Sequence, residues 1–249
     1  MSRPVTPVTL VTGASRGIGA ACALACAEAG HAVAVNFRAE AEKAAEVVAS
    51  IEAAGGRAMA VQADTSDEGQ VSAMFDAVTR DLGPVTGLVN NAGVHGPRLR
   101  VEDMAAADID HVLGVNVRGY FLCAREAVRR MSTERGGQGG AIVNVSSGSA
   151  HLGGAGGSIL YAASKGAVNS LTIGLAQEVA AEGIRVNTVA PGMTETDMPG
   201  ADRLAEQARF IPQGRIAQPE EIAEAVLWLL SDKAGHVCGA NLRVAGGRL

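Results

Sequence analysis

The 249-residue sequence predicts one α/β domain in which helices pack on a parallel sheet. Short apolar runs alternate with longer helical patterns from end to end, which is the rhythm of βαβ units. The alternation leaves no linker at which a second domain could begin, so we expect a single domain over residues 1–249. The composition agrees, since aromatic residues make up only 3% of a chain rich in Ala, Gly and Val.

In chain order, the apolar runs predict strands near Val8–Thr12, Ala32–Asn36, Ala58–Gln62, Gly87–Asn90, Ala141–Ser146, Arg185–Ala190 and Ala240–Val244. The longer patterns between them predict helices near Ile18–Ala29, Ala39–Ala54, Glu68–Arg80, Ala107–Met131, Tyr161–Ala181 and Pro219–Leu230. Open parallel sheets bind ligands outside the carboxyl ends of their strands. The residues that follow each strand are therefore the first candidates for a functional site.

Charge and cysteine content exclude several classes of protein. The chain has 21 basic and 26 acidic residues, and no block of Lys or Arg stands out, so nucleic acid is not an expected partner. Four scattered cysteines fit neither a disulfide framework nor a zinc site, which predicts a reducing cytoplasm and no metal. No apolar run is long enough for a bilayer, and the N-terminus has no signal-peptide core, so no membrane partner is expected.

A glycine-rich turn, Thr12-Gly-Ala-Ser-Arg-Gly-Ile-Gly19, follows the first strand and opens the first helix. Its glycines let backbone amides and the helix N-terminus meet a diphosphate. Such a turn can also merely reverse the chain, but its place on the first βα turn favours nucleotide binding. The candidate contacts are Gly13, Ser15, Arg16, Gly17, Ile18 and Gly19.

The residues after the second and third strands indicate which nucleotide is bound. NAD enzymes usually place a carboxylate after the second strand to bind the ribose 2′-hydroxyl, whereas this chain has Asn36-Phe37-Arg38. Arg38 and Arg16 could bind the 2′-phosphate of NADP by charge-assisted hydrogen bonds, so we expect NADP(H), with Asn36 and Arg38 among its contacts. Asp64 after the third strand is either an acceptor for the adenine amino group or a loop-capping residue.

The fourth and sixth strands also end beside candidate cofactor contacts. Asn90-Asn-Ala-Gly93 ends the fourth strand, and its small residues would let a ligand ring lie against backbone, although alone it is a turn signal. Its candidate contacts are Asn90, Ala92 and Gly93. Pro191 and Gly192 follow the sixth strand and would turn the chain across the nicotinamide end of a cofactor, where hydroxyls of Thr194 and Thr196 could hold the carboxamide.

The candidate proton-transfer group is the run Tyr161-Ala-Ala-Ser-Lys165, because residues four apart share one face of a helix. An ammonium beside a phenol favours the phenolate, so the pair could exchange a proton closer to neutral pH. Ser146 and Ser147 close the fifth strand near the same pocket. Asn116 lies in a long apolar helix, where an amide needs partners, either structural or in a relay.

Two other segments border the expected pocket. His95 and His151 have no orienting carboxylate or second ligand at a useful spacing, so a role on surface loops is favoured. The glycine cluster 148–157 allows close approach or loop movement. The segment 192–218, which contains Met193, Met198, Leu204, Phe210 and Ile211, predicts either a lid or an ordinary surface helix.

In order and separation, the motifs Thr-Gly-x-x-x-Gly-x-Gly (12–19), Asp64, Asn-Asn-Ala-Gly (90–93), Asn116, Ser147, Tyr-x-x-x-Lys (161–165) and Pro-Gly (191–192) resemble the short-chain dehydrogenase/reductase family. The resemblance covers essentially the whole chain. It implies a doubly wound Rossmann fold with a seven-stranded parallel sheet in the order 3-2-1-4-5-6-7. It also implies a homotetramer, for which the stripe Val168, Leu171, Leu175 and Val179 offers either core or partner packing.

The same resemblance implies a role for each residue of the site. Tyr161 would be the acid in carbonyl reduction and the base in alcohol oxidation. Lys165 would lower the pKa of Tyr161 and bind the nicotinamide ribose. Ser147 would hydrogen-bond the substrate oxygen, and Asn116 would hold a water that relays protons to Lys165.

Three departures from the family pattern stand out. The interval from Ser147 to Tyr161 is one residue longer than usual, so Ser146 is the alternative serine. Ala245 stands where many members have an Asp before the glycine pair. Two residues follow those glycines, so no long C-terminal lid is expected.

The substrate is left open among a ketone or aldehyde, a 3-oxoacyl thioester and a sugar. A small, mostly apolar lining favours a modestly hydrophobic carbonyl, and its expected residues are His95, Pro97, Leu152, Leu160, Met193 and Met198. An acyl carrier protein would need a basic patch, and the candidates, which could equally form a solvated surface, are Arg98, Arg100, Arg125, Arg129 and Arg130. An alternative outside the enzymes is a non-catalytic regulator that senses NADP. The presence of Ser147, Tyr161 and Lys165 argues against it, because a sensor does not need proton-transfer residues.

Overall fold

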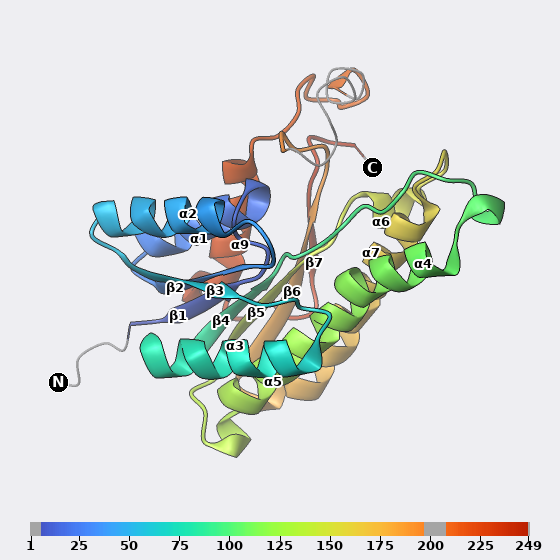
Figure 1. Cartoon of the computed structure of the whole chain (residues 1–249). Helices are drawn as coiled ribbons and strands as arrows, with labels where there is room; N and C mark the ends of the chain where they lie inside the picture. The colour runs from blue at the N-terminus through green and yellow to red at the C-terminus, as the bar shows by residue number, and fades with distance from the viewer. Residues whose placement is uncertain (1–5, 197–207, 249) are drawn as a thin grey trace.

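A computed structural model of the chain describes residues 6–196 and 208–248, and these form the predicted parallel sheet (Figure 1). The strand order is β3-β2-β1-β4-β5-β6-β7, which confirms the expected order. The strands are β1 (Val8–Val11), β2 (Ala32–Phe37), β3 (Arg57–Gln62), β4 (Val85–Asn90), β5 (Gly140–Val145), β6 (Ile184–Pro191) and β7 (Asn241–Val244). Strand β1 pairs in parallel with both β2 and β4, so the order reverses there, and open sheets of this kind form their ligand crevice at such a reversal, on the carboxyl edge.

Helices cover both faces of the sheet, as Figure 1 shows. One face packs on α1 (Gly17–Glu28), α2 (Ala41–Ala53) and α9 (Pro219–Leu230). The other packs on α3 (Glu68–Asp81), α5 (Gly119–Met131) and α7 (Ile159–Val179). Because aliphatic side chains of the central strands are buried on both faces, these strands read in the sequence as continuous apolar runs.

The predicted helix Ala107–Met131 is divided in the structure. It consists of α4 (Ala106–Leu113), a π-helical turn η2 (Gly114–Arg118) and α5. Asn116 lies within that turn and is buried. Single π-turns inside helices often occur at functional sites, and apolar periodicity that runs on through the turn gives no sign of it.

Several short helices complete the described chain. The glycine cluster 148–157 contains α6 (Ser149–Leu152). The remaining single turns are η1 (Val101–Asp103), η3 (Thr133–Arg135), η4 (Ala180–Glu182) and η5 (Asp232–Ala234).

Only part of the expected lid segment lies within the described residues. Met198 and Leu204 fall outside them. Thr194 and Ala217 form an isolated parallel bridge, so the two ends of the segment run side by side. Phe210 is exposed, whereas Ile211 is buried.

Further findings concern thiols, metals and membranes. Cys22, Cys26 and Cys123 are free and buried, as is common for free cysteines. Within residues 6–196 and 208–248, no group of three or more His, Cys, Asp or Glu side chains could hold a metal ion. Across the same ranges, no helix combines the length and apolar character that crossing a bilayer requires.

Candidate active site

The glycine-rich turn leaves β1 at the crevice and is shaped by its glycines. Gly13 and Gly17 have φ angles of +61° and +55°, which side chains rarely allow. A Cβ on Gly19 would overlap the carbonyl oxygen of Gly13 and lie 2.5 Å from Asn91 Nδ2. The three glycines therefore let the turn fold tightly against the start of α1.

The Asn-Asn-Ala-Gly segment after β4 is bonded directly to this turn. The Thr12 hydroxyl oxygen accepts hydrogen bonds from the backbone N–H groups of Asn91 and Ala92, at 2.9 and 3.1 Å. Asn91 Nδ2 donates to the carbonyl oxygens of Thr12 and Gly13, at 3.0 and 3.1 Å. A Cβ on Gly13 would lie 2.8 Å from Ala92 Cα, so neither segment has room for larger residues. The result is a cradle lined by backbone, which fits a dinucleotide.

Asn36 and Asn90 have buried side chains that bond within the chain. Asn36 Oδ1 accepts the N–H of Gly13 at 3.1 Å, and its Nδ2 donates to carbonyls around β3, including that of Ala63 at 3.1 Å. Asn90 Nδ2 donates to Asn144 Oδ1 at 3.0 Å and to the Tyr120 carbonyl at 3.3 Å. Both side chains therefore support the cradle from behind, and a contact of either residue with the cofactor stays a prediction.

Arg38 and Asp64 lie together at the end of the crevice beyond β2 and β3. Arg38 Nη1 is 3.8 Å from Asp64 Oδ2, and the arginine side chain is 57% exposed. Asp64 Oδ1 accepts hydrogen bonds from the Ser66 N–H at 2.9 Å and hydroxyl at 2.6 Å. Partial burial works to raise the pKa of Asp64, but the Ser66 bonds and the Arg38 charge outweigh it and lower the pKa. Asp64 thus caps its loop, and its contact with the adenine amino group stays a prediction.

The segment after β6 closes the crevice from the other side. A Cβ on Gly192 would lie 2.8 Å from Ala245 Cα, so Gly192 permits close packing against the residue that departs from the family pattern. The Thr196 methyl group lies 3.2 Å from the Cβ position of Gly17, next to the glycine-rich turn. Thr194 is buried, and its hydroxyl donates to the Gly192 carbonyl at 3.2 Å.

Tyr161 stands in the first turn of α7, where the helix meets the end of β5. A hydrogen bond from Ser147 reaches its hydroxyl. Ser147 Oγ also accepts the N–H of Ser149 at 3.1 Å, whereas the Ser146 hydroxyl donates to the Lys165 carbonyl at 3.0 Å in the core. This geometry supports Ser147 over Ser146 as the serine that faces Tyr161.

His95 contacts Tyr161, which corrects its assignment to a surface loop. The two rings are stacked with centroids 4.9 Å apart and planes inclined by 20°. Ring nitrogens of His95 lie 3.1 Å from the Gly96 carbonyl and 3.2 Å from Ser158 Oγ. A ring contact between residues 66 positions apart leaves no signal in the local spacing of charged residues or metal ligands.

Lys165 is buried one helical turn beyond Tyr161. Its Nζ donates to the Tyr120 hydroxyl oxygen at 2.9 Å and to the Val145 carbonyl at 2.8 Å. The Nζ atom lies 4.8 Å from the centroid of the Tyr120 ring and 6.0 Å from that of Tyr161. Burial lowers the pKa of Lys165 from 10.5 to about 7. Tyr120 is a residue of this site that the sequence analysis missed.

The pKa of Tyr161 differs from the expectation. Burial raises it above the ordinary value of 10.0, and the hydrogen bond from Ser147 opposes this shift only in part. Burial prevails over the lowering expected from Lys165, whose Nζ lies 6.0 Å from the Tyr161 ring centroid and is bonded to Tyr120 and Val145. At neutral pH the Tyr161 phenol is thus protonated and can donate.

Asn116 spans the loop after β4 and helix α7. Its Oδ1 accepts the N–H of Val94 and its Nδ2 donates to the Val94 carbonyl, both at 2.8 Å. Its Nδ2 also donates to Ser164 Oγ at 3.0 Å. These hydrogen bonds satisfy both polar atoms of the buried amide. Asn116 therefore ties together the chain segments beside Gly93 and Lys165.

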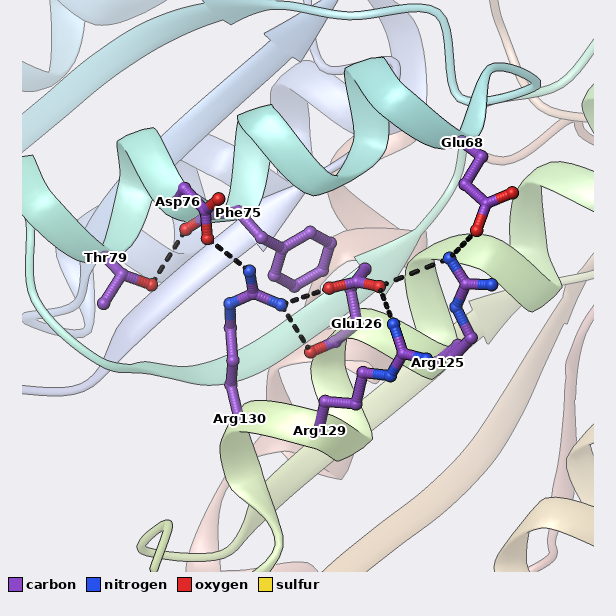
Figure 2. A network of polar contacts seen from close by, with 8 residues as sticks. All are labelled: Glu68, Phe75, Asp76, Thr79, Arg125, Glu126, Arg129 and Arg130. Atoms are coloured by element: carbon purple, nitrogen blue, oxygen red, sulfur yellow. Dashed lines mark hydrogen bonds and ion pairs between the residues drawn. The ribbon is translucent and has the colours of Figure 1, made fainter. Parts of the chain in front are cut away.

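The arginines of α5 belong to an ion-pair network with α3 (Figure 2). The Glu126 side chain is 4% exposed and pairs with Arg125, Arg129 and Arg130. Arg125 also pairs with Glu68 at 2.8 Å, and Arg130 with Asp76 at 2.5 Å. Since each of the three is paired with an acid, they do not form the unpaired basic patch that an acyl carrier protein would need.

Together, these residues place a phenol, a hydroxyl and an ammonium at the end of a backbone-lined cradle. Such a group can hold an oxygen atom, give it a proton and stabilise negative charge on it. This chemistry suits the interconversion of a carbonyl and an alcohol.

Comparison with known proteins agrees with the geometry. Residues 13–248 match the family model described as enoyl-(acyl carrier protein) reductase. The chain is 51% identical over 248 residues to the uncharacterized oxidoreductase YgfF of Escherichia coli (strain K12), covering 97% of this chain and 99% of that protein. It is 42% identical to the 3-oxoacyl-[acyl-carrier-protein] reductase FabG of Staphylococcus aureus (strain Mu50), covering 98% of each. A short-chain dehydrogenase from Burkholderia cenocepacia J2315, solved in complex with NADP, superposes with a TM-score of 0.91 at 37% identity and 97% coverage of both chains.

Proposed function

The chain belongs to the short-chain dehydrogenase/reductase family, and we propose that it is an NADP(H)-dependent oxidoreductase that interconverts a ketone or aldehyde and the corresponding alcohol. The observation that carries this proposal is the meeting of Tyr161, Ser147 and Lys165 at the end of the glycine-lined cradle.

The cradle fits the cofactor because backbone lines it on both sides. Amides of the turn between Gly13 and Gly19 would hold the diphosphate at the start of α1. Ala92 and Gly93 would lie against the nucleoside, and Pro191, Gly192 and Thr194 would border the nicotinamide end. When bound, NADP(H) supplies or accepts the hydride.

Tyr161 and Ser147 act on the substrate oxygen. Negative charge develops on that oxygen during carbonyl reduction, so two hydroxyl donors aimed at it stabilise the transition state more than the ground state. Tyr161 then gives its proton to the oxygen, and in alcohol oxidation its phenolate takes the proton back. Lys165 supports the phenolate by its positive charge.

Asn116 takes part by holding other residues in place. Its bonds to Val94 and Ser164 tie the loop after β4 to α7, so that Gly93 stays beside Lys165. We propose this bracing role in place of direct water binding by its side chain, whose amide groups are already bonded.

A panel assay of NADPH oxidation tests the proposed function. The purified protein is offered simple ketones and aldehydes, acetoacetyl thioesters and sugars, with NADPH binding measured in parallel by fluorescence. We expect turnover of modestly hydrophobic ketones or aldehydes. Preference for the acetoacetyl thioester would favour a 3-oxoacyl thioester reductase, the second candidate that the likeness to FabG supports. NADPH binding with no turnover of any class would favour the regulator instead.

Replacing Arg38 with aspartate is expected to weaken NADPH binding about tenfold or more. The substitution removes a charge-assisted hydrogen bond to the 2′-phosphate and adds repulsion. Isothermal titration with NADPH and NADH measures the effect, and NADH affinity should not fall in parallel. Arg100→Asp is the control, because Arg100 is exposed and pairs with Glu102, so this variant should leave both affinities unchanged. Unchanged NADPH affinity in R38D would remove Arg38 from the site.

The two directions of the reaction should respond oppositely to pH. Because burial raises the pKa of Tyr161, its phenol is intact through neutral pH, and reduction should vary little there. As pH rises through that pKa the phenolate forms, so reduction should fall and oxidation should rise. Initial rates in both directions between pH 6 and about 10.5 test this. Oxidation that declined steadily with rising pH would contradict the role of Tyr161 as base.

We also propose that the protein is a cytoplasmic homotetramer. Support comes from exposed Phe121 on α5 and Ile173 on α7, neighbouring helices that cover one face of the sheet. The stripe Val168, Leu171, Leu175 and Val179 is mostly turned to the core, since Val168 and Val179 are buried and Leu175 packs on the core cluster that contains Val179. Sedimentation equilibrium decides the assembly, and a monomer at micromolar concentration would refute it.

A further inference from the structure

The chain contains two tyrosines, and both lie beside Lys165. Tyr161 comes from the same helix, and Tyr120 comes from the second residue of α5, directly after the π-helical turn. The sequence also contains three lysines, of which Lys43 and Lys233 are exposed and Lys165 is buried. Within the described structure, Lys165 is therefore the one buried lysine, and its ammonium lies between the two tyrosine rings.

Tyr120, Lys165 and the Val145 carbonyl form a closed triangle of hydrogen bonds. The Tyr120 hydroxyl donates to the Val145 oxygen at 2.8 Å and accepts from Lys165 Nζ at 2.9 Å. Lys165 Nζ donates to the same Val145 oxygen at 2.8 Å. Each side of the triangle has the length of a good hydrogen bond, so all three groups restrain one another.

Tyr120 is itself held firmly. Its side chain is among the largest that are fully buried, and its carbonyl accepts from Asn90 Nδ2 at 3.3 Å. Burial raises the pKa of Tyr120 well above 10.0, and the neighbouring Tyr161 and Cys123 add to this. The phenol therefore keeps its proton for Val145 and presents its lone pairs to Lys165.

Within the part of the chain that the structure describes, no carboxylate compensates the Lys165 ammonium. The titratable groups near Lys165 are Tyr161 on its own helix, Tyr120 on α5, and His95, which stacks on Tyr161 from the loop after β4. The other neighbours are neutral, namely Asn116 beside Gly93 and the serines at the end of β5. Among the described residues, burial alone accounts for the lowered pKa of Lys165. The dipoles of Tyr120 and Val145 are thus what favours the charged form.

We propose that Tyr120 is a positioning residue for the reaction: its hydroxyl fixes the Lys165 ammonium beneath Tyr161 and keeps it charged. The effect on turnover rests on the proposed function, whereas the effect on the Lys165 titration does not. Without the hydroxyl, Lys165 loses one of two acceptors and gives up its proton at lower pH. Near neutral pH Tyr161 then has less positive charge beside it, so a smaller fraction of its phenolate forms there.

The test compares Tyr120→Phe with wild type by NMR of ε-13C lysine and by steady-state kinetics. Phenylalanine keeps the ring against the ammonium and removes only the hydroxyl. Three lysine signals are expected, and the two exposed residues serve as references. Thr172→Val is a matched control, because the Thr172 hydroxyl is equally buried and bonded to Asn144 and Thr188 but does not touch Lys165. Tyr161→Phe is the control for turnover.

In Tyr120→Phe we expect the Lys165 signal to titrate at lower pH than in wild type. Alcohol oxidation should lose about tenfold in kcat near neutral pH, the rate equivalent of one hydrogen bond to a charged group, and this loss should shrink as pH rises and Lys165 becomes neutral in both proteins. The KM of the alcohol should change little. Thr172→Val should alter neither the titration nor the pH profile.

A folded Tyr120→Phe with an unchanged Lys165 titration and pH profile would overturn the proposal. Should this variant not fold, a nuclear Overhauser effect between the Lys165 ε-protons and the Tyr120 ring in wild type decides, and its absence would overturn the proposal as well. The NMR measurements need no substrate. If the wild-type protein reduced no carbonyl compound, the proposed function would fail. The lysine titration would still show whether the Tyr120 hydroxyl stabilises the charged form of Lys165.

Discussion

Replacing Tyr161 with phenylalanine is expected to lower kcat for carbonyl reduction by about 10²–10⁴-fold, the usual contribution of a general acid. The variant keeps the ring that stacks on His95 and loses the hydroxyl that Ser147 bonds. NADPH affinity should stay within about threefold of wild type, because one neutral hydroxyl at the edge of the cradle contributes little to it. Stopped-flow measurement of NADPH oxidation, with fluorescence titration of NADPH, separates the two effects.

Ser158→Ala is a matched control for this variant. It removes a hydroxyl that touches His95, and so lies one contact from Tyr161 without being bonded to it. Its kcat should fall far less than that of Tyr161→Phe. Near-normal turnover in Tyr161→Phe would exclude the phenol as proton donor, and a matching loss in Ser158→Ala would assign the effect to a disturbed ring stack.

Replacing Gly19 with alanine is expected to weaken NADPH binding about 10- to 100-fold and to lower the free energy of unfolding by about 1–3 kcal/mol. The added methyl group would overlap the Gly13 carbonyl oxygen and lie 2.5 Å from Asn91 Nδ2. The carbonyl is backbone and Asn91 is bonded to the turn, so neither can move without opening the cradle. Calorimetric titration with NADPH and urea unfolding measure the two quantities.

Gly69→Ala is the control for Gly19→Ala. Gly69 also lies near the start of a helix, is exposed, and would bring its Cβ no closer than 3.4 Å to Asp67 Oδ1. This variant should bind NADPH like wild type and be as stable or slightly more stable, since alanine favours helix. Normal NADPH affinity in Gly19→Ala would show that the turn does not need the close contact seen in the structure.

The sequence carried most of the fold, because the buried strands and the helices between them have different apolar periods. The seven strands and their order follow the prediction, with ends that differ by a residue or two. The division of the helix around Asn116 could not be read, since a π-turn adds one residue without interrupting the apolar pattern. Only the amide itself, unfavourable inside an apolar helix, pointed to something unusual there.

Site residues that belong to a local sequence motif could be predicted. Residues whose role depends on a contact with a distant part of the chain could not. The glycine turn and the Tyr161–Lys165 spacing are local patterns, and the structure brings them together. Tyr120 reads as an ordinary core residue, since its bond to Lys165 joins positions 45 apart. The rise in the Tyr161 pKa could not be predicted for the same reason, because burial of the phenol and the bonds of the ammonium to Tyr120 and Val145 depend on packing.

Asn36 and the arginines of α5 illustrate a further limit. Asn36 stands at the position that reads the ribose in relatives of this fold, but its amide turns inward to Gly13 and β3. Arg125 and Arg130 look like a basic patch along the chain, yet α3 places Glu68 and Asp76 opposite them. Charges and amides can be counted in a sequence, but their partners depend on how the helices pack.

A crystal structure of the protein with NADP and a poorly reactive ketone tests the central claim most directly. The account predicts that the Tyr161 Oη and Ser147 Oγ atoms both lie about 2.6–3.2 Å from the ketone oxygen. Lys165 Nζ should remain beside the Tyr161 ring. A ketone oxygen held by other groups, with the Tyr161 hydroxyl directed away from it, would contradict the account.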